Sequence, residues 1–238
     1  MHDLIQLGQA EPVLKRVADA TVSLLRCTIT LTDEEWLEPS LLPGWTRAHV
    51  AAHIARNADA LNAVTRAAAE GNILPLYPSG KERMEAIERG SEQSAIELQI
   101  DLDTSAGALA ATMDAIPDWT VPVQLPTGRM PLAAVPVARL HEIYLHLRDL
   151  RCPSFSVENI EPVPARWLLQ WVLDRLENQS DAHSVDITSD SGLTARLGEG
   201  PVYLPVRGSD AALWEWLTGR SDGARVFGSR GLTWPLLD

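Results

Sequence analysis

The stretch RLHEIYLHLRDL, residues 139–150, predicts a helix that places ionisable side chains beside a core-facing stripe. Successive residues of an α-helix are rotated by about 100°, so Glu142 and His146 lie on nearly the same face, one turn apart. His141 is rotated from His146 by roughly 140°, too far for both histidines to bind one ion readily. Glu142 and His146 are therefore the pair that can act together, and His141 is expected to be a bystander.

A second predicted helix, residues 46–70, supplies a complementary ligand. It begins after Thr46, an N-cap residue within GWTRAHVAAHIARNADAL (44–61), and it ends before a glycine. His49 and His53 are also one turn apart, and the same rotation per residue places His53 closer to the apolar stripe than His49. His53 is thus the better ligand, and His49 is expected near the rim.

Two histidines and a carboxylate from facing helices leave a fourth coordination position open. That arrangement is typical of catalytic zinc sites, and imidazole also suits iron, nickel and copper. The alternative is that these three are ordinary polar residues on helix surfaces. Asn57 lies within the apolar stripe of the second helix, where it either supports a ligand through a hydrogen bond or is a buried amide with its own partners.

The chain divides into a helical part and a mixed part. Four helical segments, typical of a four-helix bundle, are predicted at residues 11–30, 46–70, 80–116 and 134–150. A Thr-Gly turn within residues 121–136 predicts a small hairpin or an extended loop. The proline-containing stretch CPSFSVENIEPVPAR marks the boundary, so two domains are expected, residues 1–152 and 153–238.

The second part predicts a small α+β domain. Its expected elements are a helix over 165–180, strands over 184–189, 193–198 and 200–208, a helix over 209–220 and a possible edge strand, ARVFG, over 224–228. Its core is expected to contain four tryptophans: Trp167, Trp171, Trp214 and Trp216.

The composition disfavours several classes of function. Lys and Arg number 20 against 32 Asp and Glu, a net charge of −12, which disfavours a nucleic-acid partner. No apolar run approaches the roughly 20 residues that span a bilayer, and the N-terminus lacks the blocks of a signal peptide. The expectation is an acidic, cytoplasmic protein with no nucleic-acid or membrane partner. In such a protein Cys27 and Cys152, far apart in sequence, are expected to be free thiols.

Three segments taken in order, GWTRAHVAAHIARNADAL, RLHEIYLHLRDL and LTGRSDGARVFG, resemble the mycothiol-dependent maleylpyruvate isomerases. These belong to the DinB-like metal-dependent bundle proteins, and the similarity covers essentially the whole chain. The resemblance implies an α+β protein in which an up-down four-helix bundle precedes a small, sterol-carrier-protein-like α+β domain. It also implies zinc, or another divalent metal, held by His53, Glu142 and His146.

The resemblance further implies that two arginines approach the active site: Arg83 in SGKERMEAIERGS and Arg220 in the Gly-Arg-Ser-Asp-Gly turn. Both are expected to act in catalysis, since arginine pairs with carboxylates in a bidentate manner. Both are also expected, with Asn57, to bind the cofactor. The alternatives are a solvated helix residue for Arg83 and a helix-dipole partner for Arg220. Met84, Arg89 and the short turn around Arg220 depart from the family pattern and bear on substrate choice.

Family members that isomerise maleylpyruvate turn its cis double bond to trans, which gives fumarylpyruvate in gentisate breakdown, and they use mycothiol. The resemblance therefore implies a zinc-activated thiolate that adds to the double bond, rotation, and elimination that returns the thiol. One alternative is a mycothiol S-transferase that detoxifies electrophiles, and another is a non-catalytic, metal-binding regulatory protein. The expected partners are mycothiol and a dicarboxylate or other electrophile, and the expected state is a monomer or weak homodimer.

Overall fold

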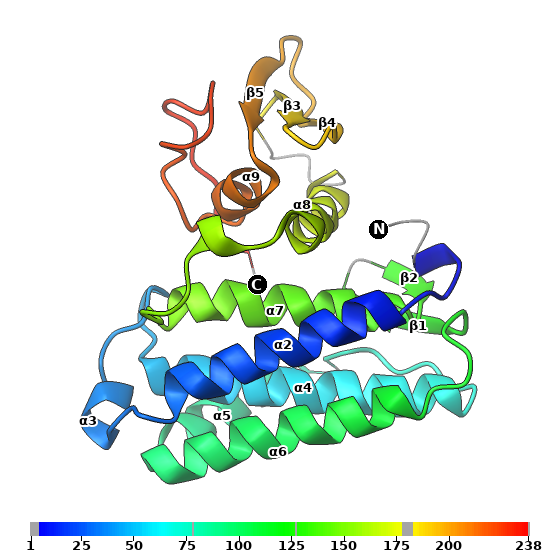
Figure 1. Cartoon of the computed structure of the whole chain (residues 1–238), viewed down its shortest axis with the longest axis vertical. Coiled ribbons are helices and arrows are strands. Elements are labelled where there is room, and N and C mark those ends of the chain that lie inside the picture. The colour runs from blue at the N-terminus through cyan, green and yellow to red at the C-terminus, as the bar shows by residue number, and fades with distance from the viewer. Residues whose placement is uncertain (1–4, 78, 127, 178–182, 238) are drawn as a thin grey trace. The chain divides into compact units, whose positions relative to one another are not determined.

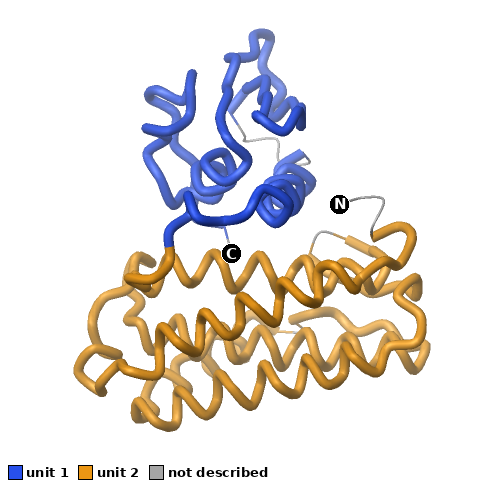
Figure 2. The backbone as a smooth tube through the Cα atoms, in the orientation of Figure 1, with its two compact units in different colours: residues 1, 156–238 blue, residues 2–155 orange. Residues whose placement is uncertain are grey.

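The chain is an α+β protein made of two compact units. The computed structural model describes residues 5–77, 79–126, 128–177 and 183–237 (Figure 1). The units comprise residues 2–155 and 156–238 (Figure 2). No helix within the described ranges is both long and apolar enough to cross a bilayer.

The first unit is an up-down four-helix bundle, as predicted. Its main helices are α2 (Glu11–Thr28), α4 (Arg47–Ala69), α6 (Ala95–Asp114) and α7 (Ala134–Asp149). Helix α4 packs against α6 and α7, and α2 packs against α7. Of the two alternatives predicted for residues 121–136, the structure has the hairpin, with antiparallel strands β1 (Pro122–Leu125) and β2 (Gly128–Pro131).

Capping residues fix where the helices begin. Helix α4 starts after Thr46, whose hydroxyl accepts a hydrogen bond from the backbone amide of His49. In return, Nδ1 of His49 accepts a hydrogen bond from the Thr46 backbone amide at 3.3 Å. His49 thus closes a capping box, a role usually taken by Glu or Gln, and this explains why it lies at the end of the helix. A short helix, α3 (Asp33–Trp36), starts with the predicted capping box of Thr32 and Glu35.

The segment 80–116, predicted as one helical region, is two helices. Helix α5 (Gly80–Ser91) ends, and Ser94 then caps α6 through Glu97, whose carboxylate accepts a hydrogen bond from the Ser94 amide at 2.9 Å. Helix α5 lies close against α4, because a Cβ atom on Gly90 would lie only 2.8 Å from Cβ of Ala52. This close approach places the C-terminal turn of α5 against α4 at Ala52, the residue before His53.

The second unit packs helices α8 (Pro162–Leu176) and α9 (Asp210–Leu217) with a three-stranded sheet. A 3₁₀ turn, η1 (Val157–Asn159), precedes α8. The sheet has the order β4-β3-β5, in which β3 pairs with β4 in antiparallel and with β5 in parallel orientation. The strands are β3 (Val185–Ser189), β4 (Thr194–Leu197) and β5 (Leu204–Gly208). All four tryptophans predicted in the core of this part are buried.

The expected edge strand at residues 224–228 is wrong. Only an isolated bridge forms there, between Arg207 and Phe227. Glycines with positive φ, Gly223 at 78° and Gly228 at 82°, turn the chain on both sides of the segment, so pairing cannot extend. The alternating apolar pattern of the segment predicted a strand that its flanking turns prevent.

The expectation of free thiols is also wrong, because Cys27 and Cys152 form a disulfide. Cys27 lies near the end of α2, and Cys152 lies just after α7, which packs against α2. The fold thereby brings their Cα atoms to 5.8 Å, although 125 positions separate them in sequence. Sequence separation therefore gave no information on their separation in space.

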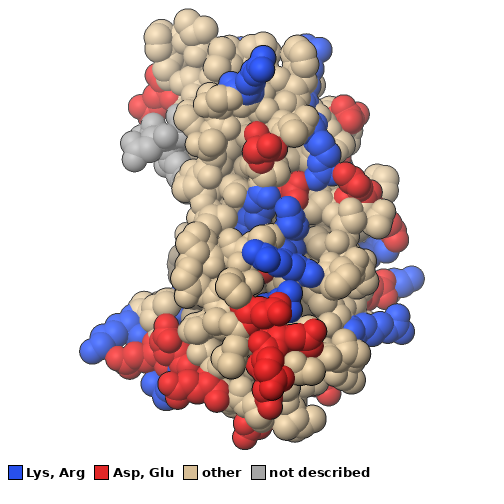
Figure 3. Space-filling view, turned by 90° about the vertical axis from the view of Figure 1, so that its left-hand side faces the viewer, with Lys and Arg blue, Asp and Glu red and all other residues tan. Residues whose placement is uncertain are grey.

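The charged surface is uneven on the face shown in Figure 3. Acidic side chains gather over the bundle on this face. The chain as a whole carries a net charge of −12.

Candidate metal centre

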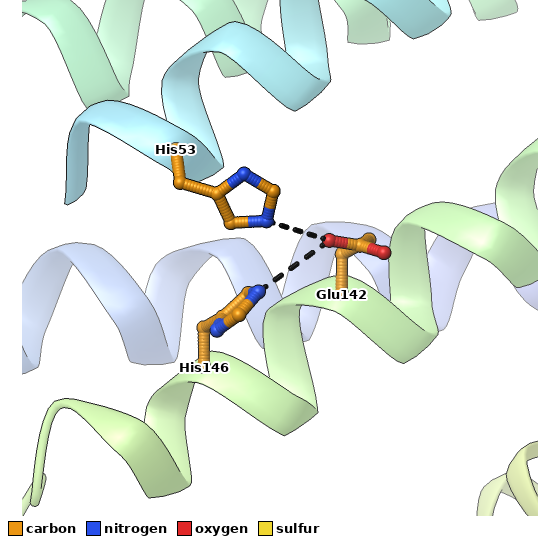
Figure 4. Close-up of side chains that lie close together, drawn as sticks. All are labelled: His53, Glu142 and His146. Atoms are coloured by element: carbon orange, nitrogen blue, oxygen red, sulfur yellow. Dashed lines mark hydrogen bonds and ion pairs between the residues drawn. The ribbon is translucent and has the colours of Figure 1, made fainter. Parts of the chain in front are cut away.

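Three side chains from two helices converge inside the bundle: His53 of α4 with Glu142 and His146 of α7 (Figure 4). One ligand atom from each lies within 4.8 Å of the others. Oε2 of Glu142 lies 3.2 Å from Nε2 of His53 and 3.5 Å from Nε2 of His146. The structure thus brings together the three residues that helix geometry selected from the sequence.

The surrounding bundle holds these side chains in place. The two imidazole rings meet edge to face with centroids 4.6 Å apart, and Trp45 packs on His53 at 5.8 Å. The His146 side chain is 1% exposed, whereas the Glu142 side chain is 13% exposed. The cluster therefore reaches solvent mainly on the side of its carboxylate.

The electrostatics favour an ionised carboxylate between two imidazoles. Burial favours the neutral acid, but hydrogen bonds with His146 and His53 outweigh it and hold the pKa of Glu142 well below its usual range. Burial, together with the neighbouring His146, lowers the pKa of His53. Burial acts in the same direction on His146, but hydrogen bonds with Asp149 and Glu142 outweigh it and raise the pKa of His146.

Asp149 supports His146 from behind. Its Oδ2 atom lies 2.9 Å from Nδ1 of His146, and the Asp149 side chain is fully buried. A carboxylate on the outer nitrogen fixes the orientation of a metal-binding imidazole and increases its basicity. Sequence reasoning missed Asp149, although its place three residues after His146 was the available signal.

The donor set suits a divalent metal such as zinc. Nε2 of His146 is buried and lies 3.5 Å from Oε2 of Glu142, so a neutral imidazole that carries its proton on Nδ1, toward Asp149, directs its lone pair into the cluster. Nε2 of His53 and Oε2 of Glu142 converge on the same place. Two imidazoles and one carboxylate complete a set that leaves a position for an exchangeable ligand, as catalytic zinc sites do.

Arg83, on α5, also reaches this cluster. Its Nη2 atom lies 3.1 Å from Nδ1 of His53. Since guanidinium can only donate, Nδ1 is the acceptor here and the ring proton resides on Nε2, which faces Glu142. The Arg83 guanidinium also lies over the ring of Tyr77, with Cζ 4.7 Å from the ring centroid.

Asn57, a candidate from the sequence, contacts Tyr77, the residue whose ring lies under Arg83. Its Nδ2 donates to the hydroxyl of Tyr77 at 3.1 Å, and its Oδ1 accepts from Nη1 of Arg139 at 2.9 Å. Nη1 of Arg139 also donates to the backbone carbonyl of Ile54 at 2.9 Å. Burial lowers the pKa of Arg139 to about 10, which leaves it charged at neutral pH. Asn57 is therefore a buried amide that links Tyr77 to a buried cation.

Sequence reasoning did not find Tyr77 or Arg139. Tyr77 lies in the linker NILPLYPSG, where no periodicity indicates which way a side chain points. Arg139 lies three residues before Glu142, on the same face of α7, and this spacing was the available signal.

The remaining candidates have other described contacts. His49 caps α4, and its Nε2 lies 3.2 Å from Oε2 of the exposed Glu88. His141 is buried on α7, outside the three-residue cluster. Arg220 belongs to the second unit and is buried, and its Nη1 donates to the carbonyls of Thr218 and Leu237.

Comparison with known proteins finds relatives over the whole chain. The family described as "Mycothiol maleylpyruvate isomerase N-terminal domain" matches residues 17–151. A crystal structure of the mycothiol-dependent maleylpyruvate isomerase has a TM-score of 0.87 and 26% identity, and the match covers 99% of this chain and 98% of that one. A mutant of that isomerase with one histidine changed to alanine has the same TM-score and coverage at 25% identity. No curated protein sequence matches the chain.

Proposed function

The chain belongs to the mycothiol maleylpyruvate isomerase family, and from this membership we propose that it is a zinc-containing, mycothiol-dependent isomerase that converts maleylpyruvate to fumarylpyruvate. The observation that carries the proposal is the convergence of His53, Glu142 and His146 within 4.8 Å, in a family that the matched isomerase structures represent. We propose these three residues as the metal ligands. We also propose a cytoplasmic enzyme that works as a monomer or weak homodimer.

Zinc, when bound, lowers the pKa of a coordinated thiol and so supplies a thiolate at neutral pH. Glu142 contributes the negative charge of the site. Asp149 holds Nδ1 of His146 and so keeps Nε2, the donor nitrogen, directed toward Glu142. The substrate double bond becomes a single bond on thiolate addition, rotates, and forms again on elimination, so no thiol is consumed.

Maleylpyruvate is a dicarboxylate, and its recognition needs cations. Arg83 is the described arginine that contacts a proposed ligand, through His53, and we propose that it binds a carboxylate of the substrate or of mycothiol. Arg220 is proposed for the same task on the resemblance of its turn alone. Asn57 contributes through Tyr77 and Arg139, since these are the residues that its side chain contacts.

The test is incubation of the zinc-loaded protein with maleylpyruvate, with and without mycothiol. The expected result is fumarylpyruvate that forms only when mycothiol is present, at an unchanged thiol concentration. Isomerisation without thiol, or no reaction, would refute the proposal. Stoichiometric loss of thiol would instead identify an S-transferase. Zinc binding that depends on His53 without any thiol-dependent turnover would identify a regulatory protein.

A further inference from the structure

Arg83 contacts His53 and Tyr77 in different ways. One contact is the hydrogen bond to Nδ1 of His53 at 3.1 Å, and the other is with the face of the Tyr77 ring, 4.7 Å from the guanidinium carbon. The hydrogen bond depends on where the imidazole proton resides, whereas the ring contact does not. The two contacts therefore respond differently when His53 acts as a metal ligand.

The geometry makes Nε2 the metal-binding nitrogen of His53, because Nε2 faces Glu142 and His146. A neutral imidazole that binds a metal through Nε2 carries its proton on Nδ1. Nδ1 is then a donor and can no longer accept a hydrogen bond from Arg83. The guanidinium then loses its hydrogen bond to His53, and Tyr77 is the described residue that still contacts it.

Tyr77 is itself firmly held. Its hydroxyl accepts a hydrogen bond from Asn57, which is fixed in turn by the buried Arg139. The linker that carries it is pinned by a bridge between Pro75 and Gln124 of strand β1. Arg139 donates to two acceptors on α4, the side chain of Asn57 and a backbone carbonyl. These hydrogen bonds fix the position of the Tyr77 ring relative to α4, the helix that carries His53.

We propose that Tyr77 is a positioning residue that keeps the Arg83 guanidinium beside the metal centre once His53 binds the metal and no longer accepts its hydrogen bond. The hydroxyl of Tyr77 fixes the ring, and the ring fixes the arginine. What Arg83 then binds rests on the proposed function, but its placement does not.

The first test is spectroscopic and needs no turnover. The Nε–H signal of Arg83 in nitrogen–proton correlation spectra of zinc-loaded protein is assigned by its absence from Arg83→Lys. We expect a ring-current shift of this signal that Tyr77→Leu abolishes and that Tyr77→Phe, which keeps the ring but loses the hydroxyl that fixes it, retains in part. Tyr203→Leu is the matched control, since Arg196 lies over Tyr203 at 5.3 Å in the second unit, and it should leave the Arg83 signal in place. An Arg83 signal that is the same in Tyr77→Leu and wild type would overturn the proposal.

The second test uses the thiol-dependent isomerisation. A cation–π contact of about 1–2 kcal/mol corresponds to a loss of about 5- to 30-fold in kcat/KM for Tyr77→Leu. The same substitution in an Arg83→Ala background should change kcat/KM by less than about twofold, because the partner is already absent. Zinc content should stay at the wild-type level in both variants.

The outcomes separate the two proposals. If wild-type protein isomerises maleylpyruvate but Tyr77→Leu costs as much without Arg83 as with it, the positioning role is wrong and the function stands. If wild-type protein has no thiol-dependent activity, the proposed function is wrong, and the Arg83 signal still decides the role of Tyr77.

Discussion

Replacement of Asp149 by asparagine is expected to weaken zinc binding while the bundle stays folded. Asp149 is fully buried, and its Oδ2 lies 2.9 Å from Nδ1 of His146. This contact directs Nε2 of His146 toward Glu142, and its negative charge makes the imidazole a stronger donor to a metal. Asparagine keeps the shape and one acceptor oxygen but removes the charge.

The expected magnitude follows from the kind of hydrogen bond that is lost. A hydrogen bond to a charged group contributes about 1.5–3 kcal/mol and a neutral one about 0.5–1.5 kcal/mol, so the exchange costs about 1–1.5 kcal/mol. That corresponds to zinc affinity weaker by about 5- to 13-fold. Substitution of residues that hold metal-binding histidines typically lowers metal affinity or activity by about 10- to 100-fold. A loss of about tenfold in zinc affinity agrees with both estimates.

The assay is competition for zinc with a chromophoric chelator at neutral pH, with thermal unfolding in excess chelator as the check on the fold. Glu88→Gln is the matched control, because Glu88 lies 3.2 Å from His49 in a similar carboxylate–imidazole pair outside the cluster, with its own side chain 61% exposed. It should leave the zinc affinity unchanged. Wild-type affinity in a folded Asp149→Asn protein, or an equal loss in Glu88→Gln, would refute the reasoning.

Four other substitutions test the site and the fold. Glu142→Gln removes the anionic ligand, and elemental analysis should find only a small fraction of the wild-type zinc; equal zinc content would remove the site. Cys27→Ser opens a disulfide that joins residues 125 apart and should lower the free energy of unfolding in urea by about 2–5 kcal/mol, whereas an unchanged value would contradict a formed bond. Gly90→Ala puts a Cβ 2.8 Å from that of Ala52 and should lower Tm, since overpacking costs about 1–3 kcal/mol against a helix gain of about 1 kcal/mol. Gly107→Ala, with nothing within 4 Å, should raise Tm instead, and the same change in both variants would contradict the close approach of α5 to α4.

Helical periodicity made the three proposed ligands, His53, Glu142 and His146, predictable from the sequence. Glu142 and His146 are separated by one turn of one helix, so their proximity follows from sequence spacing. His53 could be chosen over His49 because the apolar stripe of α4 gives the direction of the core. The pairing of α4 with α7 completes the cluster, and four amphipathic helices made a bundle the expected fold.

Tyr77, Arg139 and the disulfide escaped prediction for physical reasons. Tyr77 lies in a loop, where the chain direction changes with each residue and no face is defined. Arg139 is charged, and a charged residue on a helix is usually solvated, yet here it is buried because Asn57 and a backbone carbonyl accept its hydrogen bonds. The contact between Cys27 and Cys152 depends on how α2 packs on α7, which only the assembled fold determines.

The supports behind the ligands also indicate from which side an exchangeable ligand approaches. Asp149 closes the space behind His146, and Arg83 closes the space behind His53. Glu142 has the most exposed side chain of the three, at 13%, so solvent reaches the cluster beside its carboxylate. An incoming thiol would meet the centre there, next to the negative charge of Glu142. Since that charge disfavours an anion, a thiolate can be held there only when a cation offsets it, and the metal with Arg83 kept in place by Tyr77 would supply that positive charge.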